Sequence, residues 1–234
     1  MFKIKIADLV IEIDNRYAFV KNMCRDYIAE NEEADFCVSA TEADINAEKA
    51  VAEQAFSDGY IESVCIYRHI CNKLPSYDAF LLHASVVEVD GRSYAFSAPS
   101  GTGKSTHTRL WLETFGKRAR IINGDKPIMR FVGDELMVYG TPWCGKEGYN
   151  INTSSPLSAL CFINRGAENK IKKADEEDAV TRLFHQILLP EDEETMTCLF
   201  DLLDRMVCKI PIYELYCNIS QEAAEVAYNG MKTK

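Results

Sequence analysis

The residues FSAPSGTGKST, at 96–106, are the segment around which this chain is organised. An apolar run precedes the glycines, and a segment of helical character follows them. That order is typical of a phosphate-binding P-loop, in which a strand passes through a tight loop into the start of a helix. The glycines let backbone N–H groups converge on phosphate oxygens, and the helix start adds its free N–H groups and positive dipole end. The stretch therefore predicts a nucleotide site.

Two residues of the stretch carry side-chain chemistry. Lys104 is expected to reach the terminal phosphates, and the Ser105 hydroxyl is expected to ligate Mg²⁺. Ala98 stands where the first glycine of the strict pattern lies, and alanine fits there unless the backbone needs a positive φ. A glycine-rich surface turn is the alternative interpretation. The predicted nucleotide-binding residues are Ser100, Gly101, Thr102, Gly103, Lys104, Ser105 and Thr106.

The composition limits the class of protein. The chain has 234 residues, of which 47% are hydrophobic, enough for one large domain or for one domain with a small appendage. Its net charge of −10 argues against nucleic acids and anionic membranes as partners, because both require a basic face. The nine cysteines form no C-x-x-C pair. No apolar run approaches the length of a membrane span, and the N-terminal residues 1–6 lack the apolar core of a signal peptide. We therefore expect reduced cysteines and a cytoplasmic location.

The hydrophobic pattern predicts a mixed α/β chain. A strand is expected over residues 3–13, and helices are expected over 15–29 and 47–74. Asp90 and Gly91 join two extended runs, which is the strongest short hairpin signal. Hairpins on both sides of the glycine-rich motif distinguish this order from a doubly wound parallel sheet. Other strands are expected at 36–38, 79–89, 92–97, 119–123, 128–131, 136–139, 157–163 and 212–217, and other helices from 104 to about 116, at 178–189, at 193–207 and after Ser220.

Three short segments together resemble the HPr kinase/phosphorylase catalytic domain, whose P-loop fold is shared with ATP-dependent phosphoenolpyruvate carboxykinase. They are LHAS at 82–85, APSGTGKST at 98–106 and NGDKP at 123–127. The resemblance covers residues 78–165 and extends toward the C-terminus. It implies a mixed-sheet P-loop kinase-like domain with flanking helices at 76–234. Residues 1–75 do not resemble the N-terminal domain of full-length HPr kinases, and we expect them to form an N-terminal α/β region packed on the core.

The resemblance also implies roles for residues outside the loop. The family has a pair of acidic residues on the strand after the P-loop helix, which serve the metal and the hydroxyl acceptor. Asp125 matches the second of these residues, whereas Gly124 replaces the first. His83 matches a histidine that the family keeps near its phosphates, with phosphate contact or proton transfer as its role. The alternative for Asp125 is an ordinary aspartate in the turn before Pro127. The alternative for His83 is a histidine whose hydrogen bonds are satisfied in the core.

Three further residues are candidates for contact with a substrate or a phosphate. His107 lies four residues before Trp111, a spacing that lets the two rings pack, and substrate contact is the second interpretation. Lys146 ends the run TPWCGK and is suited to neutralise a transferred phosphate or an acidic substrate. Arg165 follows a predicted strand, where it is either a stabiliser of negative charge or an ordinary exposed arginine.

These features predict an ATP- and Mg²⁺-dependent kinase that transfers the γ-phosphate to a hydroxyl. The predicted catalytic residues are Asp125, Lys104 and His83, and the predicted metal ligands are Ser105 and Asp125. A single carboxylate suffices at this site, because phosphoryl transfer needs mainly positioning and charge neutralisation. The resemblance suggests a serine of a protein or peptide as the phosphoryl acceptor, and a small-molecule hydroxyl is the alternative. The sequence is also compatible with a homo-oligomer. Gly124 supports a second hypothesis, a non-catalytic nucleotide-binding sensor. A carboxykinase is disfavoured by the length of the chain and by the lack of the basic and metal-binding residues that its chemistry needs. A GTPase is disfavoured because the chain has no Asn-Lys-x-Asp motif.

Overall fold

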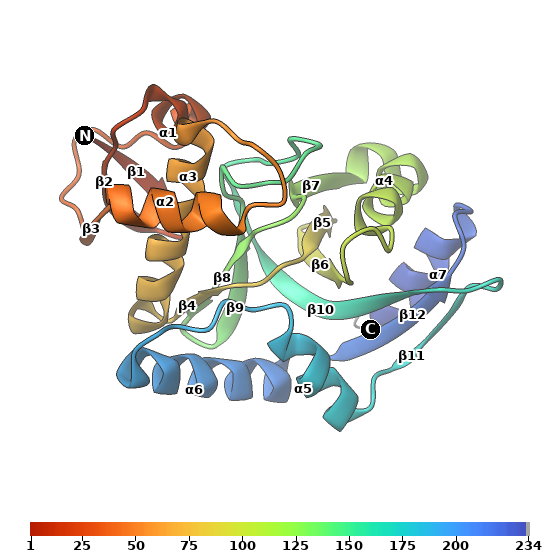
Figure 1. The fold of residues 1–234 in the computed structure, drawn as a ribbon. Coiled ribbons are helices and arrows are strands. Elements are labelled where there is room, and N and C mark those ends of the chain that lie inside the picture. Colours follow the sequence, from red (N-terminus) through yellow and green to blue (C-terminus); the bar gives the residue numbers. More distant parts are fainter. Residues whose placement is uncertain (233–234) are drawn as a thin grey trace.

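One long strand, β10 (Ser154–Arg165), joins the two parts of a nine-stranded, curled mixed sheet (Figure 1). The computed structural model describes residues 1–232. The first residues of β10 pair antiparallel with β9 (Glu135–Tyr139), and its later residues pair parallel with β6 (Arg92–Ser97) and β12 (Ile212–Cys217). The architecture is therefore mixed α/β, with parallel pairs in the centre and antiparallel pairs on both sides.

The strand directions bring four strand ends to one edge of the sheet. β5 (Ser85–Val89) is antiparallel both to β6 and to β7 (Ala119–Asn123), so β7 runs in the same direction as β6. The carboxyl ends of β6, β7, β10 and β12 consequently open at the same edge. The remaining strands are β4 (Ala79–Leu81) and β8 (Ile128–Val132), which continue the sheet beyond β9, and β11 (Lys170–Lys173), which pairs with β12.

Helices cover both faces of this sheet (Figure 1). α4 (Lys104–Phe115) and α7 (Glu222–Met231) pack on one face, in a cluster that includes Phe96 and Trp111. α5 (Glu176–Phe184) and α6 (Glu193–Lys209) pack on the other face, in a cluster that includes Ala95 and Phe162. Successive residues of a strand point to opposite faces, so Ala95 and Phe96 of β6 belong to different clusters.

The N-terminal residues form a smaller sheet with its own helices. β1 (Phe2–Ile6), β2 (Leu9–Asp14) and β3 (Phe36–Ser39) make up the sheet, accompanied by α1 (Ala18–Met23), α2 (Glu42–Val51) and α3 (Asp58–Lys73). Their hydrophobic core continues into Ile128, Tyr139 and Trp143, so they pack directly on the rest of the chain. The division into two units at residue 75 stays a prediction. Short 3₁₀ helices, η1 (Arg25–Tyr27), η2 (Leu74–Tyr77) and η3 (Gly116–Arg118), complete the chain.

Several predicted elements near the N-terminus are wrong in their extent. The strand expected at 3–13 is the hairpin of β1 and β2, which turns at Ala7 and Asp8 with φ of 52° and 57°. A turn with positive φ usually contains glycine or asparagine, so the pair Ala7-Asp8 did not indicate a turn. The helix expected at 15–29 is the short α1 followed by η1, and the region 47–74 holds α2 and α3 as separate helices. Ser57 caps the start of α3.

The predictions around the glycine-rich motif agree better with the structure. The hairpin of β5 and β6 turns at Asp90 and Gly91, and α4 ends before Gly116, whose φ is 54°. The run 79–89 splits into β4 and β5 because β4 pairs with β8. The sequence did not indicate β11, and α7 begins after Gln221, one residue later than the expected cap. All nine cysteines are free thiols. Within residues 1–232, no helix combines the length and the apolar character that a membrane crossing requires.

Candidate functional site

The glycine loop, residues 98–103, connects β6 to α4 at the edge where the strand ends meet. The chain therefore runs from strand through loop into helix, as the motif predicts. Gly101 and Gly103 have φ of 76° and 123°, a region in which other residues are strained. Ala98 is not among the described residues with positive φ, so alanine fits at this position without strain.

The first turn of α4 lacks a side-chain cap. Its N-cap is Gly103, whereas side chains cap four other helices: Thr41 caps α2, Ser57 caps α3, Asp175 caps α5 and Asp192 caps α6. The short α1 and the C-terminal α7 also start without a side-chain cap. An uncapped helix start leaves backbone N–H donors without partners, and an anion at that position is favourable. The loop and the helix start thus offer donors to an anionic ligand.

Lys104 brings a buried cation to the same loop. Its side chain is only 9% exposed, and its Nζ donates a hydrogen bond to the carbonyl oxygen of Ala98 at 2.8 Å. Burial lowers the pKa of the Lys104 ammonium, and the charge of Asp125 opposes that change. The ammonium is held inside the loop by a neutral acceptor, which leaves its charge available to a ligand.

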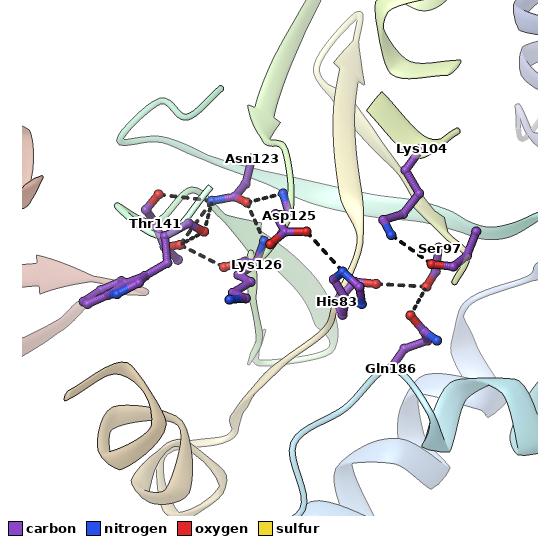
Figure 2. A network of polar contacts seen from close by, with 10 residues as sticks. His83, Ser97, Lys104, Asn123, Asp125, Lys126, Thr141 and Gln186 are labelled. Carbon is purple, nitrogen blue, oxygen red and sulfur yellow. Dashed lines mark hydrogen bonds and ion pairs between the residues drawn. The ribbon is translucent and has the colours of Figure 1, made fainter. Parts of the chain in front are cut away.

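The opposite wall of the site is the turn after β7. The buried side chain of Asn123 holds this turn in place. The Asn123 Oδ1 accepts hydrogen bonds from the backbone N–H groups of Asp125 at 2.9 Å and Lys126 at 2.7 Å (Figure 2). The Asn123 Nδ2 donates to the carbonyl oxygen and the hydroxyl of Thr141, both at 3.1 Å. Tyr67 of α3 donates its hydroxyl to the Lys126 carbonyl at 2.7 Å. The backbone next to Asp125 is therefore held by the side chains of Asn123 and Tyr67.

Asp125 and His83 form the central pair of the site. The Nε2 of His83 lies 3.1 Å from Oδ1 of Asp125 (Figure 2). Burial raises the pKa of the Asp125 carboxyl, but the hydrogen bond from His83 and the charges of His83, Lys126 and Lys104 outweigh it, so the net pKa is lowered. The carboxylate is thus ionised at neutral pH and accepts the Nε2–H of His83.

His83 is itself held by the backbone around it. Its N–H donates to the carbonyl oxygen of Gln186 at 2.7 Å, and its own carbonyl oxygen lies 2.9 Å from the hydroxyl of Ser97. The same hydroxyl lies 3.0 Å from Oε1 of Gln186 (Figure 2). Ser97 is the last residue of β6, so this network links His83 directly to the strand that leads into the glycine loop.

The two walls enclose a cavity of about 540 Å³, within the usual size of ligand pockets. Three lysines but only two carboxylates line it, although the whole chain carries a net charge of −10. A local excess of positive charge in an acidic protein favours an anionic ligand. The lining residues are His83, Ser100, Gly101, Gly103, Lys104, Ser105, Thr106, Gly124, Asp125, Lys126, Gly145, Lys146 and Glu147.

The structure gives a steric reason for the missing first acid at Gly124. A Cβ at this position would lie 2.9 Å from the carbonyl oxygen of Cys144, and the Gly124 N–H donates to the Tyr149 carbonyl at 2.8 Å. The segment 144–149 therefore occupies the space that a second carboxylate would need. The same segment packs on Asp125, because a Cβ at Gly145 would lie 3.0 Å from the Asp125 Cβ.

The other predicted residues fall in three places. Lys146 is exposed and lines the cavity opposite the glycine loop. Arg165, at the end of β10, supports the loop from outside, with its guanidinium 2.7 Å from the Gly101 carbonyl and 3.4 Å from the Thr102 carbonyl. His107 accepts a hydrogen bond from Trp111 at 3.0 Å, which confirms that the two rings pack. Arg165, Thr102 and His107 do not line the cavity that holds Asp125.

Four residues that position the site were not assigned a role from the sequence: Ser97, Asn123, Lys126 and Gln186. An asparagine followed by Gly-Asp at a strand end is a turn signal, which would have identified Asn123. Gln186 is 89 residues from Ser97, its hydrogen-bond partner, and no local pattern predicts such a pair.

The donor set suits Mg²⁺ that is bound together with phosphates. Within residues 1–232, no three or more His, Cys, Asp or Glu side chains gather into a metal site. Asp125 and Ser105 nevertheless line the same cavity, and both present oxygen atoms. Mg²⁺ takes oxygen ligands, often only one or two from the protein, with water and substrate phosphates completing its shell. The residues present therefore fit this ion.

Comparisons with known proteins identify a distant structural similarity. No protein-family model matches the chain, and no curated protein matches it in sequence. Among solved structures, the chain is similar to the HPr(Ser) kinase/phosphatase from Coxiella burnetii, with 8% sequence identity and a TM-score of 0.38. The match covers 64% of this chain and 95% of that chain. A similarity of this size concerns the path of the chain and carries no information about activity, ligands or substrates.

Proposed function

We propose that this protein is an ATP- and Mg²⁺-dependent kinase with a P-loop fold of the HPr kinase type, which transfers the γ-phosphate to a hydroxyl. The observation that carries the proposal is the ionised Asp125, paired with His83 at 3.1 Å, in one cavity with Lys104 and the uncapped start of α4. Such a site combines donors for a polyphosphate with a base for a hydroxyl. The sequence motif at 98–106 and the resemblance in LHAS and NGDKP support the same conclusion.

In this proposal, the glycine loop and Lys104 bind the polyphosphate. Backbone N–H groups of the loop and of the α4 start donate to phosphate oxygens, and Nζ of Lys104 leaves the Ala98 carbonyl for the terminal phosphates. Ser105 and Asp125 would hold Mg²⁺, which would neutralise negative charge on the phosphates. Lys146, on the facing segment, adds positive charge at the open side of the cavity.

Asp125 would orient the acceptor hydroxyl and accept its proton. A bond forms between the acceptor oxygen and the γ-phosphorus, while the bond from that phosphorus to the β–γ bridging oxygen breaks, so that ADP leaves. The acceptor proton passes to the Asp125 carboxylate. His83 donates to Oδ1 of that carboxylate, which would leave the other oxygen for the hydroxyl. The resemblance favours a serine of a protein or peptide as acceptor, and a small-molecule hydroxyl is the alternative.

A non-catalytic ATP sensor is the second candidate function, and Gly124 favours it. The space for a second carboxylate is filled by the backbone of residues 144–149, so one acid would have to serve both metal and acceptor. A sensor needs only the phosphate-binding half of this arrangement.

The Asp125→Asn variant separates the two functions. We expect the wild type to transfer label from γ-labelled ATP to an acceptor in a lysate of its own cell when Mg²⁺ is present. The variant should lose transfer by about 10²–10⁴-fold, because it lacks the general base. Its ATP affinity, measured by calorimetry, should change much less, because the loop and Lys104 supply most of the phosphate contacts.

Glu147→Gln is the matched control, because Glu147 is the other carboxylate of the cavity and is exposed. It should retain transfer. Loss of transfer in Glu147→Gln but not in Asp125→Asn would reassign the base. A wild type that binds ATP but labels no acceptor would support the sensor instead of the kinase.

A further inference from the structure

An apolar groove of about 210 Å³ lies on the surface between α5 and α6. Phe184 of α5 and Phe200 of α6 line it, with ring centroids 5.8 Å apart, and its only polar lining residue is Asp204. The two rings are 39% and 45% exposed, although phenylalanine is among the residues most often buried. An apolar cavity of about 150 Å³ is large enough to hold benzene, so this groove has room for one large apolar side chain.

The apolar surface of the groove is not needed to attach the two helices to the sheet. Leu183 of α5 and Leu202 and Met206 of α6 belong to the core cluster on that face of the sheet. Phe184 and Phe200 lie outside this cluster and remain exposed. A helix with one buried face is expected to carry polar residues on its opposite face. The groove is therefore an apolar surface without a partner in residues 1–232.

The segment that forms the groove is strongly acidic. Residues 175–209, which include both helices, contain ten acidic and three basic residues, so this segment has a net charge of −7, compared with −10 for the whole chain. Each of the three basic residues already has an ion-pair partner. The pairs are Arg182 with Asp178, Arg205 with Asp78, and Lys209 with Asp134.

Four exposed carboxylates near the groove have no such partner. Asp204 lines the groove, and Asp201 lies one helical turn earlier on α6. Glu176 and Glu177 lie one turn before Val180, on the same side of α5. Among the described residues, no basic side chain forms an ion pair with any of these four. Unpaired carboxylates around an apolar groove favour a cationic partner.

This charge selects among the possible occupants of the groove. Carboxylates repel nucleic acids and anionic membranes. A two-fold contact between the same faces of two copies would bring like charges together. A protein segment with lysines or arginines around one large apolar side chain satisfies both the groove and its acidic surroundings.

We propose that the groove between α5 and α6 docks a positively charged segment of a partner protein, with one large apolar side chain of that segment between Phe184 and Phe200. This docking goes beyond the proposed function and requires no nucleotide. α5 leads directly into Gln186, whose carbonyl oxygen accepts the His83 N–H at 2.7 Å. A partner on α5 therefore rests on the element that continues into the Asp125 site.

Two synthetic peptides test the proposal. The first consists of lysines and alanines with one central phenylalanine, and the second has a serine in place of the phenylalanine at the same net charge. Fluorescence anisotropy measures the binding of each labelled peptide to the full chain without ATP. We expect the phenylalanine peptide to bind at least about tenfold more tightly than the serine peptide, because only its ring is buried in the groove.

Two variants of the chain, each with a matched control, locate the binding site. Phe200→Ser should reduce the preference for the phenylalanine peptide to less than about threefold, and Asp204→Asn should weaken both peptides about threefold. Phe56→Ser is the control for the ring, because Phe56 is 38% exposed and lies before α3, outside the groove. Glu53→Gln is the control for the charge, because Glu53 is exposed in the same region. Both controls should bind the peptides as the wild type does.

Three results would overturn the proposal: equal affinities of the wild type for the two peptides, an unchanged preference in Phe200→Ser, or an equal loss in Phe56→Ser. Circular dichroism checks the folding of each variant, and Phe184→Ser replaces Phe200→Ser if the latter does not fold. None of these measurements involves ATP, so failure of the docking proposal leaves the kinase proposal intact, and the reverse also holds.

Discussion

The two walls of the Asp125 cavity are built in opposite ways. The turn 123–126 is fixed by a buried asparagine, whose amide makes hydrogen bonds to backbone on both sides, and by Tyr67 from the N-terminal region. The glycine loop is held by few contacts, mainly those from Lys104 and Arg165 to its carbonyl oxygens, and the helix after it has no cap. The polar groups of the turn are satisfied within the protein, whereas donors of the loop are left for a ligand.

This difference fits the role that the proposed function gives to each wall. A general base works only within hydrogen-bond reach of the proton that it takes, so its backbone must be fixed before the acceptor arrives. A phosphate cradle needs unpaired donors, and their cost is removed when the anion binds. Variants of the loop should therefore act mainly on ligand affinity, and variants of the turn should act on stability and on transfer.

The largest effect on ligand affinity is expected for Lys104→Ala, which removes the buried cation of the loop. The affinity for ATP and for tripolyphosphate should fall by at least about 100-fold, since charge-assisted hydrogen bonds to phosphate are among the strongest contacts available here. Calorimetric titration with Mg²⁺ measures both affinities. Lys146→Ala is the matched control, because this exposed lysine lines the same cavity. Its affinity for ATP and tripolyphosphate should fall only a few-fold. A larger loss in Lys146→Ala would place the phosphates on the facing segment instead.

The Asn123→Ala variant tests the fixed wall. The substitution leaves the N–H groups of Asp125 and Lys126 and the Thr141 carbonyl without their buried partner, which should lower the free energy of unfolding by about 2–4 kcal/mol. Phosphoryl transfer should fall as well, while ATP affinity of the folded fraction stays near that of the wild type. Urea denaturation measures the stability change.

Asn152→Ala is the control for this variant. Asn152 is exposed and makes a single hydrogen bond to the Asp26 carbonyl, so its removal should cost no more than about 1 kcal/mol. Equal destabilisation in the two variants would show that the turn is not the rigid wall inferred from its hydrogen bonds.

The smallest effect is expected for Ala98→Gly, which restores the strict motif. Ala98 already has a backbone conformation that alanine adopts without strain, so ATP affinity should stay within about twofold of the wild type. Gly101→Ala is the opposite control, because a residue with a side chain is strained at φ of 76°. This variant should bind ATP more weakly than the wild type. A gain of about tenfold in Ala98→Gly would mean that the alanine had strained the cradle.

Several features of this chain could be predicted because they depend only on neighbouring residues. The strand, the glycine loop and the start of α4 follow from the order of apolar, glycine and helix-forming residues at 96–106. The hairpin at Asp90 and Gly91 and the end of α4 at Gly116 follow from local φ preferences. Such features need no information about distant parts of the chain, because backbone sterics and hydrogen bonding within a few residues decide them.

The contacts that complete the site could not be predicted, because they join residues far apart in the sequence. His83 and Asp125 lie 42 residues apart and meet because β5 pairs with β7, which brings their ends together at one edge. The presence of glycine at position 124 has a different cause. The backbone of residues 144–149 fills the place that a second carboxylate would need. The contact of Gln186 with Ser97 likewise depends on packing between elements far apart in sequence. Register and packing fix these contacts, and no pattern of neighbouring residues encodes them.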